Sequence, residues 1–146
     1  MNTSNTNGIT LLFPGQGSQY VGMGQDLIDG PGYNLIKKAN EVLGFSLEDI
    51  MLNGPDETLK QTKYTQPAIL AHSMALFENI KITLKKYNLK INRVLGHSVG
   101  EYAALVSAEV MTFEDAIKAV YLRGSYMQEA VPEGRGKMLA ILKLPL

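Results

Sequence analysis

The chain has 146 residues, of which 45% are hydrophobic and 19% are charged, as is ordinary for one globular domain with a buried core. Its 14 basic residues balance 14 acidic ones, so the net charge favours neither nucleic acid nor an anionic membrane as a partner. The chain contains no cysteine, which excludes a disulfide framework, a thiol nucleophile and a cysteine-based zinc site, and no apolar run approaches the length of a membrane span.

Residues 1–8 are polar and uncharged and lack the basic start and apolar stretch of a signal peptide. We therefore expect a disordered lead-in to a cytoplasmic protein. The apolar run Ile9–Phe13, ended by Pro14 and Gly15, predicts a buried strand.

The loop over residues 14–19 lies where that strand ends, which is the usual edge for a site in an α/β sheet. It is not a nucleotide-binding loop: Tyr20 stands where a dinucleotide fingerprint needs its third glycine, and Met23 where a P-loop needs lysine. Gln16 therefore belongs either to a shaped polar loop at a site or to a plain connection between a strand and a helix.

Apolar periodicity and capping residues predict helices over Tyr33–Leu43, over Ser46–Leu52, in a short turn that Asp56 caps, and over about Pro67–Tyr87. In the last of these, the buried stripe is expected to consist of Leu70, Met74, Phe77, Ile80, Leu84 and Tyr87. His72 lies off that stripe and is predicted to be a surface histidine without a catalytic role.

Gly96-His97-Ser98-Val99-Gly100 follows a predicted strand over Ile91–Leu95 and precedes a predicted helix over 101–106. A G-x-S-x-G between a strand and a helix is typical of a nucleophile elbow, a turn so tight that its flanking positions must be small. The turn holds the Ser98 hydroxyl at a helix N-terminus, where developing negative charge is favoured. The alternative is a serine that only caps the helix.

A further helix is predicted from the cap residue Thr112 to about Ala130, with Arg123 on its apolar face beside Val120 and Met127. Two explanations of this arginine stay open. It either snorkels or pairs with an acid such as Glu101, or it is a buried guanidinium that binds an anionic ligand. The apolar run over residues 137–144 predicts a final strand.

Several stretches together resemble the malonyl-CoA:acyl carrier protein transacylases of fatty acid synthesis and the acyltransferase domains of polyketide synthases. They are Phe13-Pro14-Gly15-Gln16-Gly17-Ser18-Gln19, Thr65-Gln66-Pro67-Ala68, Gly96-His97-Ser98-Val99-Gly100-Glu101-Tyr102, Leu122-Arg123-Gly124 and Met127-Gln128-Glu129-Ala130-Val131-Pro132-Glu133-Gly134. The resemblance covers nearly all of the chain after Gly8 and fits the stand-alone bacterial enzymes especially well.

The resemblance implies that Ser98 is the nucleophile that takes malonyl from coenzyme A and passes it to the phosphopantetheine thiol of acyl carrier protein. The backbone N–H groups of Gln16 and Val99 would form the oxyanion hole, and Arg123 would bind the malonyl carboxylate. His97 would be structural, and the branched Val99 would favour malonyl over methylmalonyl. No metal or cofactor is implied, since malonyl-CoA is a substrate.

The implied fold is α/β, with a hydrolase-like parallel-sheet core, a nucleophile elbow and an inserted ferredoxin-like subdomain. Residues 9–133 would be the N-terminal part of the α/β subdomain and residues 134–146 the start of the insertion. The family's basic histidine matches no residue here, so we expect this chain by itself to be inactive and only marginally folded. The alternatives are a polyketide synthase acyltransferase domain, a serine hydrolase and a non-catalytic truncated product.

Overall fold

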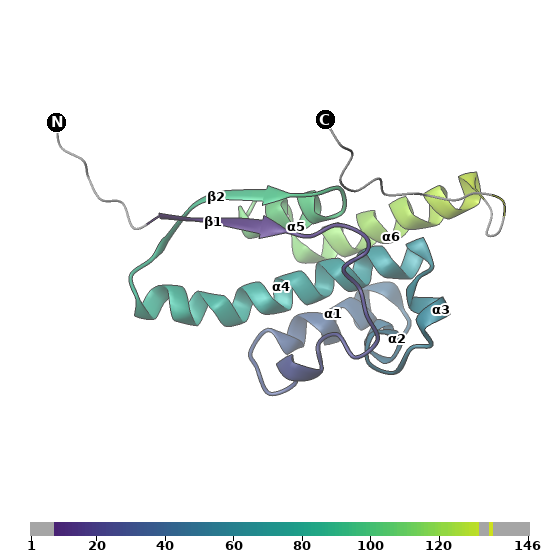
Figure 1. Ribbon diagram of the computed structural model, residues 1–146, viewed down its shortest axis with the longest axis horizontal. Helices are drawn as coiled ribbons and strands as arrows, with labels where there is room; N and C mark the ends of the chain where they lie inside the picture. The colour runs from purple at the N-terminus through teal and green to yellow at the C-terminus, as the bar shows by residue number, and fades with distance from the viewer. Residues whose placement is uncertain (1–7, 132–134, 136–146) are drawn as a thin grey trace, which may run out of the picture.

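The computed structural model describes residues 8–131 and 135. Two parallel strands, β1 (Gly8–Phe13) and β2 (Lys90–Gly96), lie side by side above a layer of helices (Figure 1). Parallel strands joined by helices make this an α/β fold, as predicted. The expected strand over 137–144 lies outside the described residues. So does the expected lead-in over residues 1–8, apart from Gly8, which is the first residue of β1 and not part of a lead-in.

The segment between the two strands is helical. It contains η1 (Gln25–Leu27), α1 (Tyr33–Leu43), α2 (Leu47–Asn53), α3 (Asp56–Leu59) and α4 (Thr62–Lys86), and after β2 come α5 (Gly100–Ser107) and α6 (Phe113–Ala130). The predicted caps are confirmed for α2 and α6, where Ser46 and Thr112 accept hydrogen bonds from backbone N–H groups. Asp56 is no cap: it lies in the first turn of α3, where its carboxylate pairs with Lys60.

The two strands end level with each other. Phe13 lies opposite Gly96, after a register shift between Ile9 and Thr10, and the His97 N–H donates to the Phe13 carbonyl at 3.1 Å. Because the carboxyl ends of parallel strands share one edge, the loop after β1 and the turn after β2 are neighbours there.

Helix α4 begins at Thr62, earlier than predicted, so Pro67 lies inside it. The helix passes under the sheet, and its C-terminal end extends past the helices that cover its first half (Figure 1). Leu70, Met74, Phe77 and Leu84 are buried as predicted. Ile80 and Tyr87 are 41% and 60% exposed, so this part of the prediction is wrong, because no described helix covers that end of the stripe.

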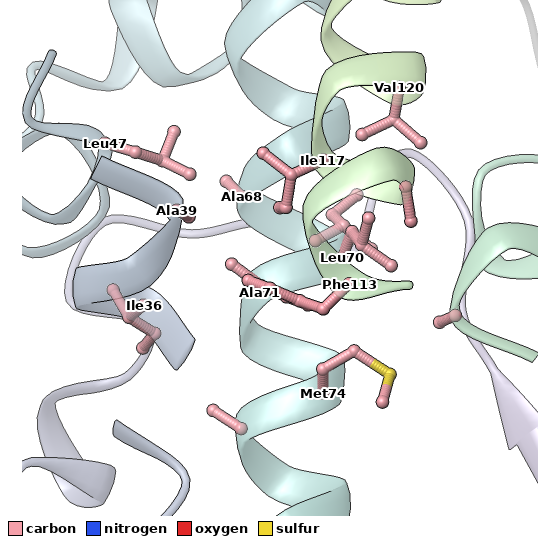
Figure 2. Packing of buried hydrophobic residues seen from close by; sticks show 14 of the residues in the cluster. Ile36, Ala39, Leu47, Ala68, Leu70, Ala71, Met74, Phe113, Ile117 and Val120 are labelled. Carbon is pink, nitrogen blue, oxygen red and sulfur yellow. The ribbon is translucent and has the colours of Figure 1, made fainter. Parts of the chain in front are cut away.

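The core lies between α1, α4 and α6 (Figure 2). Ala39, Ala68 and Ala71 have no exposed surface, and such small side chains let the three helices approach closely. At the crossing of α6 over α4, a Cβ on Gly124 would lie 2.6 Å from the Thr62 carbonyl oxygen. The absence of a side chain there brings the middle of α6 against the first turns of α4.

Candidate active site

Ser98 lies on the turn between β2 and α5 with a φ of +55°, a left-handed conformation that is uncommon for residues other than glycine. The turn is closed by hydrogen bonds from the Gly100 N–H to the His97 carbonyl and from the Glu101 N–H to the Ser98 carbonyl, at 2.9 and 3.1 Å. Ser98 itself is exposed. Backbone strain of this kind is concentrated at functional sites.

The glycines around Ser98 are required by close backbone contacts, as predicted. A Cβ on Gly96 would lie 2.1 Å from the Gly100 carbonyl carbon, and one on Gly100 would lie 2.4 Å from the Phe13 carbonyl oxygen. A Cβ on Gly15 would lie 2.5 Å from Nδ1 of His97, so the imidazole packs on the loop after β1. This contact gives His97 a packing partner at the turn.

Gln16 and Val99 are on the two neighbouring connections at this edge. The Gln16 side chain donates from Nε2 to Thr62 Oγ1 at 3.4 Å, which ties the loop to the start of α4. Val99 is 1% exposed and immediately precedes α5. Within the described residues, nothing accepts a hydrogen bond from the backbone N–H of either residue.

Arg123 reaches this edge from α6. Its Nη2 donates to Ser98 Oγ at 3.1 Å, and its Nη1 donates to Gln66 Oε1 at 2.6 Å. Both partners are neutral, and no ion pair among residues 8–131 involves Arg123, so the pairing with Glu101 is not formed there. The guanidinium therefore places a positive charge beside the Ser98 hydroxyl, with donors that fit a carboxylate.

Gln66 was not singled out as a site residue from the sequence. Its side chain is fully buried, with no exposed surface. The signal that could have revealed it is a polar side chain directly before Pro67 and the apolar run Ala68–Leu70 in a predicted helix.

His72 does not belong to this site, and the prediction that it is a surface residue is wrong. It is half-buried and lines an apolar cavity of about 250 Å³ between β1 and α4, together with Phe13, Ile69 and Phe77. Its Nε2 is buried without a hydrogen-bond partner in the described part of the chain. Burial lowers the pKa of His72, against an opposing effect of Asp26.

Residues 10–143 match the family model of the acyl transferase domain. The chain belongs to the acyl transferase domain family. Its described residues include no helix long and apolar enough to cross a membrane, and no group of three side chains that could hold a metal ion.

Relatives of this acyl transferase domain carry more specific names. The malonyl CoA-acyl carrier protein transacylase of Haemophilus influenzae is 48% identical over 139 residues, which cover 92% of this chain and 43% of the relative. The solved acyl carrier protein S-malonyltransferase of Vibrio cholerae is 48% identical with a TM-score of 0.73, over 86% of this chain and 40% of that one.

A solved malonyl-transacylase in complex with a type II PKS acyl-carrier protein is 44% identical with a TM-score of 0.75, over 86% of this chain and 40% of that one. The chain thus spans less than half the length of the curated and solved relatives that it matches.

Proposed function

We propose that this chain forms the nucleophile-bearing part of an enzyme that transfers malonyl from malonyl-CoA to the phosphopantetheine thiol of an acyl carrier protein. The observation that carries the proposal is the contact of Arg123 Nη2 with Ser98 Oγ at 3.1 Å, a carboxylate-binding group beside a strained, exposed serine. The names of the relatives support the same substrate and acceptor.

In the first half-reaction, Ser98 Oγ attacks the thioester carbonyl of malonyl-CoA, an ester bond to Ser98 forms, and the bond to the coenzyme A sulfur breaks. The oxyanion of the tetrahedral intermediate accepts hydrogen bonds from the backbone N–H groups of Gln16 and Val99. The N-terminus of α5, directly after this turn, adds its positive dipole end. The turn acts as a nucleophile elbow in this scheme.

In the second half-reaction, the phosphopantetheine thiol attacks the ester, the new thioester forms, and Ser98 Oγ leaves and is reprotonated. Since both half-reactions pass through the same kind of intermediate, one oxyanion hole serves both.

Arg123 selects the acyl group. The free carboxylate of malonate is one methylene away from the reacting carbonyl, so a guanidinium in contact with Ser98 Oγ is within reach of it. The carboxylate replaces Ser98 Oγ as the acceptor of Nη2. An acetyl group leaves this donor without an anionic partner, which makes plain acetyl the poorer substrate.

A general base must take the proton from Ser98, and the described residues contain no candidate in contact with it. His97 packs on Gly15, His72 lies in a separate cavity, and these are the two histidines of the chain. We place the base in a part of the enzyme outside the described residues, and we assign residues 9–133 to the N-terminal part of the hydrolase-like α/β subdomain. The proposed scheme also assigns residues 134–146 to the start of a ferredoxin-like subdomain.

A serine hydrolase would use the same turn, but it has no need of Arg123 beside its nucleophile. An acyltransferase of polyketide synthesis is the closer second candidate, because one of the solved relatives binds a type II PKS acyl-carrier protein. The two differ in the carrier protein that they acylate, so transfer rates to purified carriers of each kind distinguish them.

The test is covalent labelling of the complete enzyme that carries this chain, with malonyl-CoA and acetyl-CoA followed by intact-mass spectrometry. We expect a malonyl adduct that forms faster than the acetyl adduct and disappears when carrier protein is added. Ser98→Ala should abolish the adduct, while Ser107→Ala, which removes a hydroxyl that bonds to Ala104 in α5, should retain it. An adduct that persists in Ser98→Ala refutes the proposal.

A further inference from the structure

Gln66 is a fully buried amide whose two ends have different partners. Its Oε1 accepts from Arg123 Nη1 at 2.6 Å, and its Nε2 donates to Met127 Sδ at 3.4 Å. Buried polar groups keep such partners because an unpaired one is costly. The guanidinium only donates, so the amide atom that faces it must be the oxygen. The thioether then accepts at the other end, and the orientation of the amide is determined.

Two closely packed helices carry this contact. Gln66 precedes Pro67 within α4, and Arg123 precedes Gly124 in α6, where the two helices cross with a hypothetical Gly124 Cβ only 2.8 Å from Lys63 Cα. The separation of the two side chains is therefore set by packed helices and not by a loop.

The two terminal nitrogens of the Arg123 guanidinium have different partners. Nη1 is held by Gln66, and Nη2 extends to Ser98 Oγ. An arginine without an anchor has many rotamers, and ordering it on substrate binding would cost conformational entropy. An anchor also has to be neutral, because a carboxylate at this place would neutralise the guanidinium and compete with the carboxylate of the substrate.

We propose that Gln66 is a positioning residue that sets acyl specificity: it holds Arg123 so that Nη2 is ready, beside Ser98, to bind the carboxylate of a dicarboxylic acyl group. The inference rests on the proposed function. It adds that the preference for malonyl depends on a neutral acceptor in α4 as well as on the arginine.

The test measures kcat/KM of the complete enzyme for malonyl-CoA and for acetyl-CoA. Gln66→Met keeps the length of the side chain and removes the acceptor; we expect the malonyl-to-acetyl preference to fall about 10-fold, mostly through a higher KM for malonyl-CoA. Gln66→Glu keeps the shape and the acceptor but adds a charge, and it should lower the preference at least as much. It also provides the test if the Met variant does not fold.

Gln128→Met is the matched control. Gln128 bridges the same two helices, because its Oε1 accepts from the Lys63 N–H at 3.5 Å. Within the described residues, the hydrogen bonds of Arg123 go to Gln66 and Ser98 and not to Gln128. We expect it to keep the wild-type preference. Equal losses for both substrates in the Gln66 variants would show a packing role and overturn the inference.

A preference unchanged in the Gln66 variants but lost in Arg123→Ala would overturn the inference and leave the proposed function standing. A preference unchanged in Arg123→Ala would instead refute the carboxylate-binding role of Arg123, and with it the proposed function.

Discussion

Arg123 Nη2 lies 3.1 Å from Ser98 Oγ, although the two residues are 25 positions apart and belong to different elements. Ser98 lies on the turn after β2, and Arg123 lies on α6, which packs across α4. The Ser98 hydroxyl can attack a carbonyl, and the Arg123 guanidinium can hold a carboxylate. The distance between them suits an acyl group that contains both a carbonyl and a carboxylate.

Arg123→Ala should lower kcat/KM for malonyl-CoA by about 100-fold and leave that for acetyl-CoA much less affected, because the charge-assisted hydrogen bonds to the free carboxylate are lost. Arg123→Lys should recover little of this preference, since one ammonium group cannot contact both Gln66 and Ser98 in the fork geometry of arginine. Steady-state kinetics with both substrates measure the effect.

Arg93→Ala is the control for that experiment, because Arg93 is an exposed cation on β2 away from the turn. It should keep the wild-type ratio of the two kcat/KM values. A similar loss of preference in Arg93→Ala would mean that general electrostatic attraction, and not a clamp, selects the substrate.

Gly100→Ala should destabilise the protein by about 3 kcal/mol, because its Cβ would meet the Phe13 and Pro14 carbonyl oxygens, which belong to backbone and cannot rotate away. Gly44→Ala is the comparison: Gly44 has a φ of +75° at the end of α1 but open space around it, so the cost is about 1 kcal/mol for the backbone conformation alone. Urea unfolding gives both values, and equal values would contradict tight packing of the turn against β1.

His72 should make the stability of the fold depend on pH. Its pKa is lowered by burial from the ordinary value of 6.5, so below pH 6.5 the unfolded chain binds a proton more readily than the folded one. Neutral His72 should therefore contribute fully to the free energy of unfolding above pH 6.5. The free energy of unfolding should decrease as the pH falls from 6.5 toward the lowered pKa.

Urea unfolding between pH 7.5 and pH 5 measures this effect as the difference between the wild type and His72→Leu, which should have the flatter profile. His97→Asn changes an exposed histidine and should leave the His72-dependent slope in place. Identical profiles for wild type and His72→Leu would show that the buried imidazole does not contribute.

The chain of 146 residues, purified by itself, should transfer no measurable malonyl to carrier protein. Ser98 has no base among the described residues, and an unactivated hydroxyl is a poor nucleophile at neutral pH. Transfer measured with radiolabelled malonyl-CoA, with the complete enzyme as the positive control, checks this. Turnover by the isolated chain would show that a group within it serves as the base.

Local patterns were sufficient for the turn at Ser98 and for most helices. The G-x-S-x-G spacing, the capping residues Ser46 and Thr112, and the stop at Gly44 act through neighbours within a few positions, and the structure has them as expected. These features follow from the sequence because steric and hydrogen-bonding constraints within one turn do not depend on the rest of the fold.

Contacts between distant segments decided the rest. Periodicity placed Arg123 on an apolar face of its helix. Only the packing of α6 in the tertiary structure shows that its hydrogen-bond partners are Ser98, 25 positions away, and Gln66, 57 positions away. The same holds for His72, which is half-buried beside Tyr20 and Gly24 of the loop after β1, and for Ile80, which is exposed because no described helix covers it. A helical pattern specifies which side chains share a face, but what packs on that face is determined by the tertiary structure.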